Sequence, residues 1–260
     1  MKNILYIVFS AALLLSCEPD NVADQVEDLV VIKSILFEGE DEHEVLLSRI
    51  NPIGDQSSEK PISGASVSLV GAGQTAVFTE DEVDAGHYLT SGELTTFSGQ
   101  VFRVEAVVDG RIVSSETSMP EPVQFISISD QLVLIDEQDP GAQVFEVSWI
   151  QEEGYEYVLL LHEPDDDPES IQFGVPSGNF EAVYELPTEK NFLTIYASDF
   201  RYYGEHLLEI IRIDTEYASV FRYAPGINHH VFNGPDNVSG GAGYVTGVSS
   251  VMIGLNVQEQ

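Results

Sequence analysis

Apolar and polar residues alternate with a period of two along most of the chain after residue 28. Residues 65–70 alternate apolar with small polar side chains, and residues 144–149 alternate up to Trp149. Because successive side chains of a strand point to opposite faces of a sheet, this pattern predicts half-buried strands, with Trp149 in the core. Residues 214–223 also fit helical spacing, so a short helix is an alternative there. Strands are expected at residues 29–37, 45–50, 65–70, 75–79, 87–90, 101–108, 111–115, 123–128, 132–135, 144–149, 155–162, 192–197, 206–214, 218–221 and 248–257.

Turn signals divide these strands into short units. Asp109-Gly110 separates two predicted strands and is typical of a type I′ hairpin turn, because both residues tolerate a positive φ. Short strands with such turns between them are typical of an all-β sandwich. Proline cannot donate a hydrogen bond to a sheet, so Met119-Pro120-Glu121-Pro122 predicts a domain boundary. We therefore expect an all-β chain with two β-sandwich domains of immunoglobulin or fibronectin type, at residues 28–118 and 122–260.

The first sixteen residues predict a secretory signal peptide. Lys2 supplies a positive charge, and residues 4–15 form an apolar run that is shorter than the roughly 20 residues needed to span a bilayer. Leu14-Leu15-Ser16-Cys17 resembles a lipobox, at which lipoprotein signal peptidase cleaves before a cysteine that becomes acylated. An ordinary signal peptide with a chance cysteine is the alternative, but Cys17 is the only cysteine in the chain. We expect residues 1–16 to be removed and Cys17 to be lipidated.

Residues 17–27 are predicted to form a lipidated acidic tether. Glu18 and Asp20 lie just after the cysteine, and acidic residues in this place resemble the surface-export signals of Bacteroidota lipoproteins. A plain solvated linker is the alternative interpretation. The export interpretation predicts a protein that is lipid-anchored in the outer membrane and exposed at the cell surface.

The composition is strongly acidic, with 44 Asp and Glu residues against 10 Lys and Arg residues and a formal net charge of −34. Residues 112–189 contain eighteen acidic residues and no Lys or Arg. Such a surface repels the phosphates of nucleic acid and of lipid headgroups, which excludes DNA or RNA binding. High-salt adaptation, divalent-cation binding and attraction of a cationic partner each explain the excess of acidic residues. The spread of the charge along the chain favours salt adaptation.

Several short segments occur in an order and spacing that carry a family resemblance. Besides Cys17, they are Leu29-Val30-Val31, Val45-Leu46-Leu47-Ser48-Arg49, Pro61-Ile62-Ser63-Gly64-Ala65-Ser66-Val67, Gly86-His87-Tyr88, Met119-Pro120, Phe232-Asn233 and Asn237-Val238-Ser239-Gly240-Gly241-Ala242-Gly243-Tyr244. Together they resemble a family of Bacteroidota outer-membrane lipoproteins known as domain of unknown function 4249. The resemblance implies a β-rich lipoprotein, often encoded beside a TonB-dependent outer-membrane transporter, and it brings no established catalytic residues. The chain departs from the family pattern in being shorter and more acidic.

Residues 163–169 form the densest carboxylate cluster of the chain. Hard cations prefer oxygen ligands, so Asp165, Asp166, Asp167 and Glu169 are a candidate calcium site. The segment lacks the central glycine and the distal bidentate glutamate of an EF-hand, and its flanking prolines favour a solvated acidic loop. We therefore expect no cofactor and no metal, with calcium at this loop as the alternative.

The histidines form no diagnostic catalytic pattern. His229 and His230 are adjacent and would point to opposite faces of a strand, whereas zinc sites require three or four ligands. His162 and His206 are candidates to converge in space. The sequence contains no Gly-x-Ser-x-Gly elbow, metalloprotease helix motif or phosphate-binding glycine loop. A glycosidase-like carboxylate pair has no diagnostic spacing in so acidic a chain.

Residues 199–204 predict an exposed aromatic loop, because the segment ends in Gly204 and lacks alternation. Phe200, Tyr202 and Tyr203 are therefore the candidate contacts for a ligand or partner, since aromatic side chains are enriched at interfaces. Packing of these rings in the core between strands is the alternative.

The sequence favours a non-enzymatic binding or accessory lipoprotein, anchored in the outer membrane and partnering a TonB-dependent transporter. A surface hydrolase with dispersed carboxylates, acting on glycan or peptide, is one alternative, and a structural or adhesive envelope protein is another. A nucleic acid partner is not expected.

Overall fold

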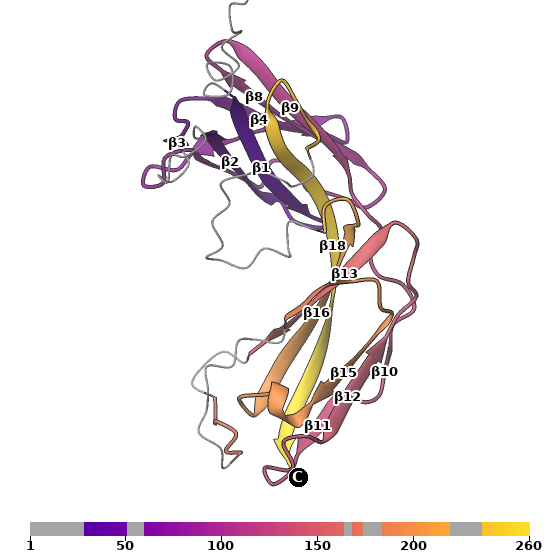
Figure 1. Cartoon of the computed structure of the whole chain (residues 1–260). Helices are drawn as coiled ribbons and strands as arrows, with labels where there is room; N and C mark the ends of the chain where they lie inside the picture. Colours follow the sequence, from indigo (N-terminus) through magenta and orange to yellow (C-terminus); the bar gives the residue numbers. More distant parts are fainter. Residues whose placement is uncertain (1–28, 51–59, 164–167, 174–183, 219–235) are drawn as a thin grey trace, which may run out of the picture.

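The computed structural model describes residues 29–50, 60–163, 168–173, 184–218 and 236–260. Within these residues the chain forms strands β1 to β18, arranged in three sheets, and a 3₁₀ turn at Ala197–Asp199. The prediction of an all-β fold is confirmed. Figure 1 shows an elongated molecule, in which one pair of packed sheets forms the N-terminal half and a second pair forms the C-terminal half.

The largest sheet has ten strands and extends through both halves of the molecule (Figure 1). Its strands are β1 (Val30–Phe37), β2 (Glu42–Arg49), β3 (Lys60–Pro61), β6 (Thr79–Glu80), β7 (His87–Ser91), β11 (Leu132–Ile135), β13 (Tyr155–His162), β14 (Tyr184–Thr188), β16 (Gly204–Asp214) and β18 (Ala242–Glu259). They lie in the order β14-β13-β16-β18-β1-β2-β7-β6, while β11 pairs with β18 and β3 pairs with β2.

Two smaller sheets cover one face of the large sheet. The smaller strands are β4 (Ser66–Gly71), β5 (Gln74–Val77), β8 (Val101–Val108), β9 (Arg111–Ser118), β10 (Ser127–Ile128), β12 (Gln143–Ser148), β15 (Phe192–Tyr196) and β17 (Val238–Ser239). The five-stranded sheet has the order β17-β9-β8-β4-β5 and packs on the N-terminal half of the large sheet. The three-stranded sheet has the order β10-β12-β15 and packs on the C-terminal half.

Strand β18 belongs to both halves of the molecule. Residues 242–248 pair in parallel with β1, and residues 248–257 pair antiparallel with β16. Residues 256–259 also pair in parallel with β11. The eighteen residues of β18 therefore make one continuous sheet out of strands from both halves.

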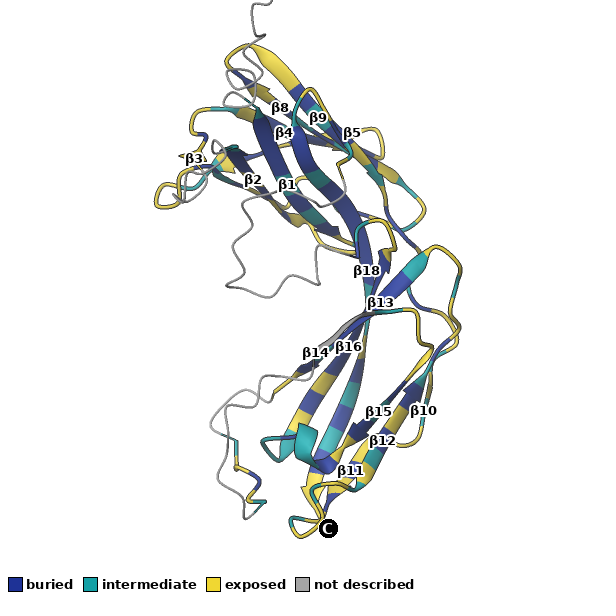
Figure 2. Ribbon diagram, in the orientation of Figure 1, coloured by how far each residue is buried: buried dark blue, intermediate teal, exposed yellow. Residues whose placement is uncertain are grey.

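Two separate hydrophobic cores lie between the large sheet and the two smaller sheets. The first core lies between the ten-stranded and five-stranded sheets and contains Ile32 and Phe102, both fully buried. The second core lies under the three-stranded sheet and contains Phe145 and Tyr157. The prediction that Trp149 is a core residue is confirmed, because it is 3% exposed and its ring centroid lies 5.3 Å from that of Tyr157. Figure 2 shows the alternation of buried and exposed positions that accompanies this packing.

A third, smaller cluster lies on the opposite face of the ten-stranded sheet. Val158 belongs to it, whereas its neighbours Tyr157 and Leu159 belong to the second core. Ile211, Ile213 and Val248 complete its strand residues, and Ala218 packs against them. The face of the sheet that no smaller sheet covers is thus partly apolar where the two halves meet.

Most strands follow the predicted pattern, and the differences have local causes. β8, β11 and β13 have the predicted bounds, and Asp109 and Gly110 adopt positive φ values of 51° and 78°, as the hairpin prediction requires. β18 begins six residues before the expected strand, because Gly243 approaches β1 so closely that a Cβ atom would overlap the Ile32 carbonyl oxygen. Ala218 lies in a turn rather than a strand, with its amide donating to the Asp214 carbonyl at 3.1 Å.

Candidate functional site

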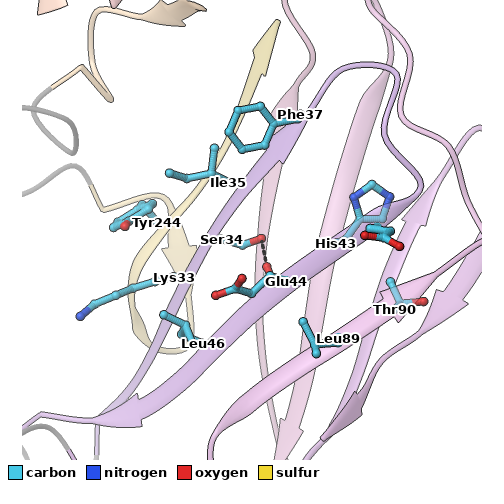
Figure 3. A pocket seen from close by; sticks show the side chains of 11 residues that line it. Lys33, Ser34, Ile35, Phe37, His43, Glu44, Leu46, Leu89, Thr90 and Tyr244 are labelled. Atoms are coloured by element: carbon cyan, nitrogen blue, oxygen red, sulfur yellow. Dashed lines mark hydrogen bonds between the residues drawn. The ribbon is translucent and has the colours of Figure 1, made fainter. Parts of the chain in front are cut away.

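An open hollow of about 660 Å³ lies where β1, β2, β7 and β18 meet, on the face of the ten-stranded sheet that neither smaller sheet covers among the described residues (Figure 3). Alternation along β1 places Ile32 and Leu36 in the first core and turns Lys33, Ile35 and Phe37 toward the hollow. The hollow is lined by Lys33, Ser34, Ile35, Phe37, Glu42, His43, Glu44, Leu46, Leu89, Thr90 and Tyr244.

The lining of this hollow combines an apolar part, made of Phe37, Leu46 and Leu89 and called the floor below, with charged side chains such as Glu44, the register partner of Leu89. Phe37, Leu46 and Leu89 are 37%, 42% and 40% exposed, although they lie on three different strands. The His87 Nε2 atom lies 3.0 Å from a Glu44 carboxylate oxygen, at ion-pair distance but not aligned for a hydrogen bond. An apolar floor beside fixed charges is the usual chemistry of a site that binds a ligand or a peptide.

The Ser34 hydroxyl group at this hollow has a structural role. The Ser34 Oγ atom donates a hydrogen bond of 2.7 Å to the Glu44 carbonyl, which joins β1 to β2 (Figure 3). A serine that is to act as a nucleophile needs instead a base that accepts its proton. The Ser34 hydroxyl is therefore a structural donor between two strands.

A smaller, polar hollow of about 250 Å³ lies at the far end of β2. There an Arg49 guanidinium nitrogen lies 2.6 Å from an Asp109 carboxylate oxygen, which joins β2 to the β8–β9 turn. The lining consists of Arg49, Pro61, Ile62, Ser63, Gly64, Ala65, Val108 and Asp109.

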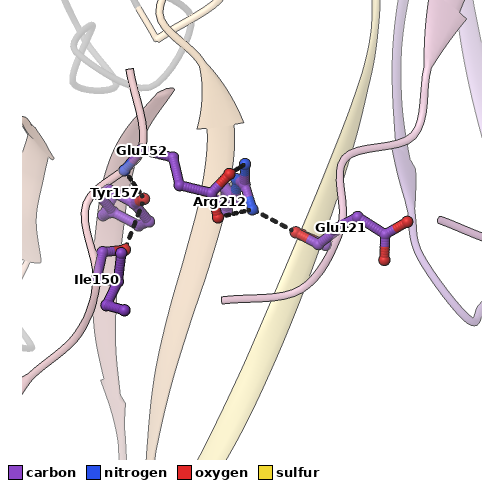
Figure 4. A network of polar contacts seen from close by, with 6 residues as sticks. Glu121, Ile150, Glu152, Tyr157 and Arg212 are labelled. Atoms are coloured by element: carbon purple, nitrogen blue, oxygen red, sulfur yellow. Dashed lines mark hydrogen bonds and ion pairs between the residues drawn. The ribbon is translucent and has the colours of Figure 1, made fainter. Parts of the chain in front are cut away.

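A polar network joins the linker between the halves to the C-terminal half (Figure 4). The Arg212 guanidinium group donates two hydrogen bonds of 2.9 and 2.7 Å to the Glu152 carboxylate, and a third of 3.1 Å to the Glu121 carbonyl. It also lies 3.8 Å from the ring centroid of Tyr155. The Ser249 hydroxyl donates to the same Glu121 carbonyl at 2.9 Å, which ties the linker to β18. The network fixes the linker onto the large sheet.

Several residues predicted as sites lie outside the described residues. These are the lipidation site Cys17, the export residues Glu18 and Asp20, the calcium candidates Asp165, Asp166 and Asp167, and the pair His229 and His230. Glu169 is described and exposed, and its carbonyl accepts a hydrogen bond from the Tyr203 amide at 2.9 Å. Among the described residues, no group of three or more His, Cys, Asp and Glu side chains is arranged to hold a metal ion.

The predicted aromatic loop is exposed only in part. Phe200 is 1% exposed and belongs to the second core, so the expectation of an exposed ring was wrong at this position. The Tyr203 ring packs against the same core, and its hydroxyl lies 3.0 Å from a Glu137 carboxylate oxygen. Burial and this carboxylate raise the pKa of Tyr203 to about 12. Tyr202 is half-buried, and a partner contact through Tyr202 or Tyr203 stays a prediction.

The candidate pair His162 and His206 does not converge. Alternation places them on opposite faces of the ten-stranded sheet, since His162 shares the face of Val158 while His206 shares the face of Leu208. The His162 Nε2 atom lies 2.9 Å from a carboxylate oxygen of Glu209. His206 is 1% exposed, and its burial lowers its pKa.

The motif Gly86-His87-Tyr88 has a structural explanation. Tyr88 is 1% exposed, and its hydroxyl donates to the Ile62 carbonyl at 2.8 Å and accepts from the Ala65 amide at 3.0 Å. The tyrosine therefore ties β7 to the segment that contains a second motif, at residues 61–67. Sequence reasoning recognised both motifs but could not show that they contact each other.

Glu80 reinforces the same junction. Its carboxylate accepts hydrogen bonds from the Gly64 amide at 2.7 Å and from the Gly86 amide at 3.2 Å. The Ser63 hydroxyl and these two amides hold the pKa of Glu80 below its ordinary value. The carboxylate is thus a structural acceptor rather than a catalytic base.

Asn237 gives the glycine-rich motif near the C-terminus its structural role. Its side-chain amide donates to the Val245 carbonyl at 2.8 Å and to the Glu116 carbonyl at 3.2 Å, while its side-chain oxygen accepts from the Val245 amide at 3.0 Å. One side chain therefore joins β18, β9 and the start of β17. Like Tyr88, it stabilises the fold and does not line the hollow.

The described residues define an all-β protein of packed sheets, with an open hollow on the face of the large sheet opposite the two smaller sheets. The chain belongs to the family called domain of unknown function 4249, whose model matches residues 18–224. The predicted membership of this family is thereby confirmed, although Cys17 and the motifs at residues 232–233 and 237–244 lie outside the matched range. No curated protein matches the chain. None of the described residues forms a helix with the length and apolar content needed to cross a membrane.

Proposed function

We propose that this chain is a non-enzymatic binding or accessory lipoprotein of a Bacteroidota-type outer membrane, held at the cell surface by a lipidated Cys17. In this proposal residues 1–16 are a signal peptide, and two β-sandwich units follow the tether. The units divide near residues 119–122, and β17 with the first part of β18 completes the first unit. A TonB-dependent transporter is the proposed partner.

The hollow over β1, β2 and β7 is the observation that supports a binding role. It exposes Phe37, Leu46 and Leu89 together, whereas exposed apolar side chains elsewhere in a soluble domain are usually scattered. The carboxylate of Glu44 and the ammonium group of Lys33 give this face polar groups that orient a partner. Binding needs no activated nucleophile, which agrees with the hydrogen bond that Ser34 donates to the backbone.

Two variants test this proposal in the native membrane. Replacement Cys17→Ala removes the acylation site, and the protein should then leave the membrane fraction. Replacement Leu46→Glu places a charge on the floor of the hollow, and it should abolish co-purification of a transporter from detergent-solubilised membranes. Val77→Glu is the matched control, because Val77 is 58% exposed on a strand of the five-stranded sheet. Retention of the transporter by Leu46→Glu would refute the role of the hollow.

A further inference from the structure

One end of the N-terminal half gathers basic residues that are far apart in the sequence. Arg49 is the register partner of Val30 and of Lys60, and it also contacts Asp109 in the β8–β9 turn. Arg111 directly follows that turn. We name this end, made of Arg49, Lys60, Val107, Arg111 and Ile112, the hairpin tip.

The hairpin tip combines these bases with exposed apolar surface. Val107 and Ile112 are cross-strand partners at the end of the hairpin, and they are 36% and 58% exposed. Arg111 adjoins Ile112 in the same hairpin, and Arg49 reaches the turn of this hairpin through its contact with Asp109. Basic side chains next to exposed aliphatic ones are the features that bind the boundary between lipid headgroups and acyl chains.

The hairpin tip also lies where the tether joins the fold. β1 begins at Val30, and Figure 1 shows the start of β1 and the β8–β9 turn at the end of the molecule opposite the C-terminus. The inference rests on the proposed lipidation of Cys17. Cys17 and Leu29 are 12 positions apart in the chain, and a fully extended chain of this length spans at most about 43 Å. The eighteen residues of β18 extend about 60 Å, so the tip is the end that the anchor holds near the bilayer.

The distribution of charged residues favours one of two orientations of the molecule on the membrane. A molecule lying flat would bring residues 121–189, with their seventeen acidic residues and no Lys or Arg, against anionic headgroups. A molecule standing on the hairpin tip presents Lys60 and Arg111 to those headgroups and keeps the acidic half away. We propose that the hairpin tip binds the phosphate headgroups of the membrane that holds the anchor, so that the C-terminal half and the hollow stand clear of the bilayer.

Single-cysteine reporters test this orientation on the complete acylated protein. Acylation leaves Cys17 without a free thiol, so an introduced cysteine is the only site for a thiol-reactive dye. Ser66→Cys reports on the tip, because Ser66 is exposed and is the register partner of Val107. Gly141→Cys reports on the opposite end, where a Cβ atom makes only an ordinary contact with Asp139. Energy transfer to acceptor-labelled lipid is measured in vesicles of phosphatidylethanolamine and phosphatidylglycerol.

We expect strong transfer from position 66 and weak transfer from position 141. Lys60→Gln should lower the population of the bound tip about fivefold, and raised NaCl should do the same. Ile112→Thr, which keeps a β-branched side chain, should also weaken the contact. Lys190→Gln removes the same charge from an exposed site in the C-terminal half and should change nothing.

The outcomes separate this inference from the proposed function. Absence of an acyl chain on Cys17 in protein isolated from cells overturns the anchor and removes the basis of the orientation. An acylated protein with equal transfer from both reporters overturns the orientation alone. Equal effects of Lys60→Gln and Lys190→Gln would also overturn the proposed orientation, because the net charge of the protein, and not the hairpin tip, would then explain its contact with the membrane.

Discussion

The ion pair between Arg212 and Glu152 predicts an unequal effect of removing its two partners. The Arg212 side chain is 3% exposed, whereas the Glu152 side chain is 43% exposed. Replacement Glu152→Ala leaves the guanidinium group buried without an anion. Replacement Arg212→Met leaves a carboxylate that turns into solvent, and the methionine retains much of the apolar contact with Tyr155. Replacement of the exposed Glu152 should therefore lower the free energy of unfolding more than replacement of the buried Arg212.

The structure sets the size of this difference. Breaking a buried ion pair by removing one partner costs about 3–5 kcal/mol, and the partial exposure of Glu152 reduces this to about 2–3 kcal/mol for Glu152→Ala. Arg212→Met loses the hydrogen bonds to Glu152 and to the Glu121 carbonyl, and we expect a cost of about 1–2 kcal/mol. The double variant should cost about as much as Arg212→Met alone, because no buried charge remains.

Urea unfolding followed by fluorescence measures these free energies. Trp149 is the only tryptophan of the chain and lies in the second core, so its emission reports on the half that contains the pair. Glu153→Ala is the control, since Glu153 is exposed beside Glu152 and should change stability by less than about 0.5 kcal/mol. The reasoning is refuted if Arg212→Met destabilises the protein as much as Glu152→Ala does at an unchanged m-value.

Three further changes test the structural roles of single side chains. Tyr88→Phe should lower the free energy of unfolding by about 1–3 kcal/mol, because the Ile62 carbonyl and the Ala65 amide lose their partner; urea unfolding would contradict this if the midpoint stayed the same. Asn237→Asp keeps the size of the side chain but places a carboxylate against two carbonyls, and a thermal melt should show a loss of about 2–4 kcal/mol. Burial lowers the pKa of His206, so the unfolded state binds the proton more readily and stability falls as the pH drops below 6.5. His206→Gln cannot take up this proton, so the variant should lose less stability at low pH, by up to about 1.4 kcal/mol per pH unit. Urea unfolding of the natural protein and of the variant at several pH values measures this difference. Equal losses of stability in the two proteins would contradict the prediction.

The strands of the fold could be predicted because their signal is local. Alternation with period two locates β8, β11 and β13 to the residue, and Asp109-Gly110 identifies the hairpin between β8 and β9. The start of β18 was missed because Gly241 and Gly243 interrupt the alternation of apolar and polar residues there. They are in fact needed for the close approach to β1, a strand about two hundred residues earlier in the chain.

The site and the network could not be predicted, since both depend on pairing between distant segments. The floor of the hollow combines Phe37, Leu46 and Leu89, which come from three strands whose order in the sheet the sequence does not give. Arg212 and Glu152 are 60 residues apart and meet only because β13 pairs with β16. The aromatic loop was misjudged at Phe200 because a loop without alternation can still turn one ring into the core.

The position of β18 argues that the matched family range is not a complete folding unit. The match ends at residue 224, whereas β18 begins at Ala242 and supplies buried side chains to both halves. Val245 belongs to the first core, and Leu255 and Val257 belong to the second. Each such side chain contributes about 1.5–3 kcal/mol, so loss of the strand removes an amount comparable with the whole stability of a domain, about 5–15 kcal/mol.

A chain shortened after residue 235 should therefore show no cooperative unfolding transition by circular dichroism or by Trp149 fluorescence. Neither half should fold, because β1 in the first half and β16 in the second each lose a neighbouring strand. Removal of only residues 259–260, which are exposed, is the control and should leave the transition almost unchanged. A chain without β18 that still unfolded cooperatively at the same urea concentration would show that each half folds without the strand they share.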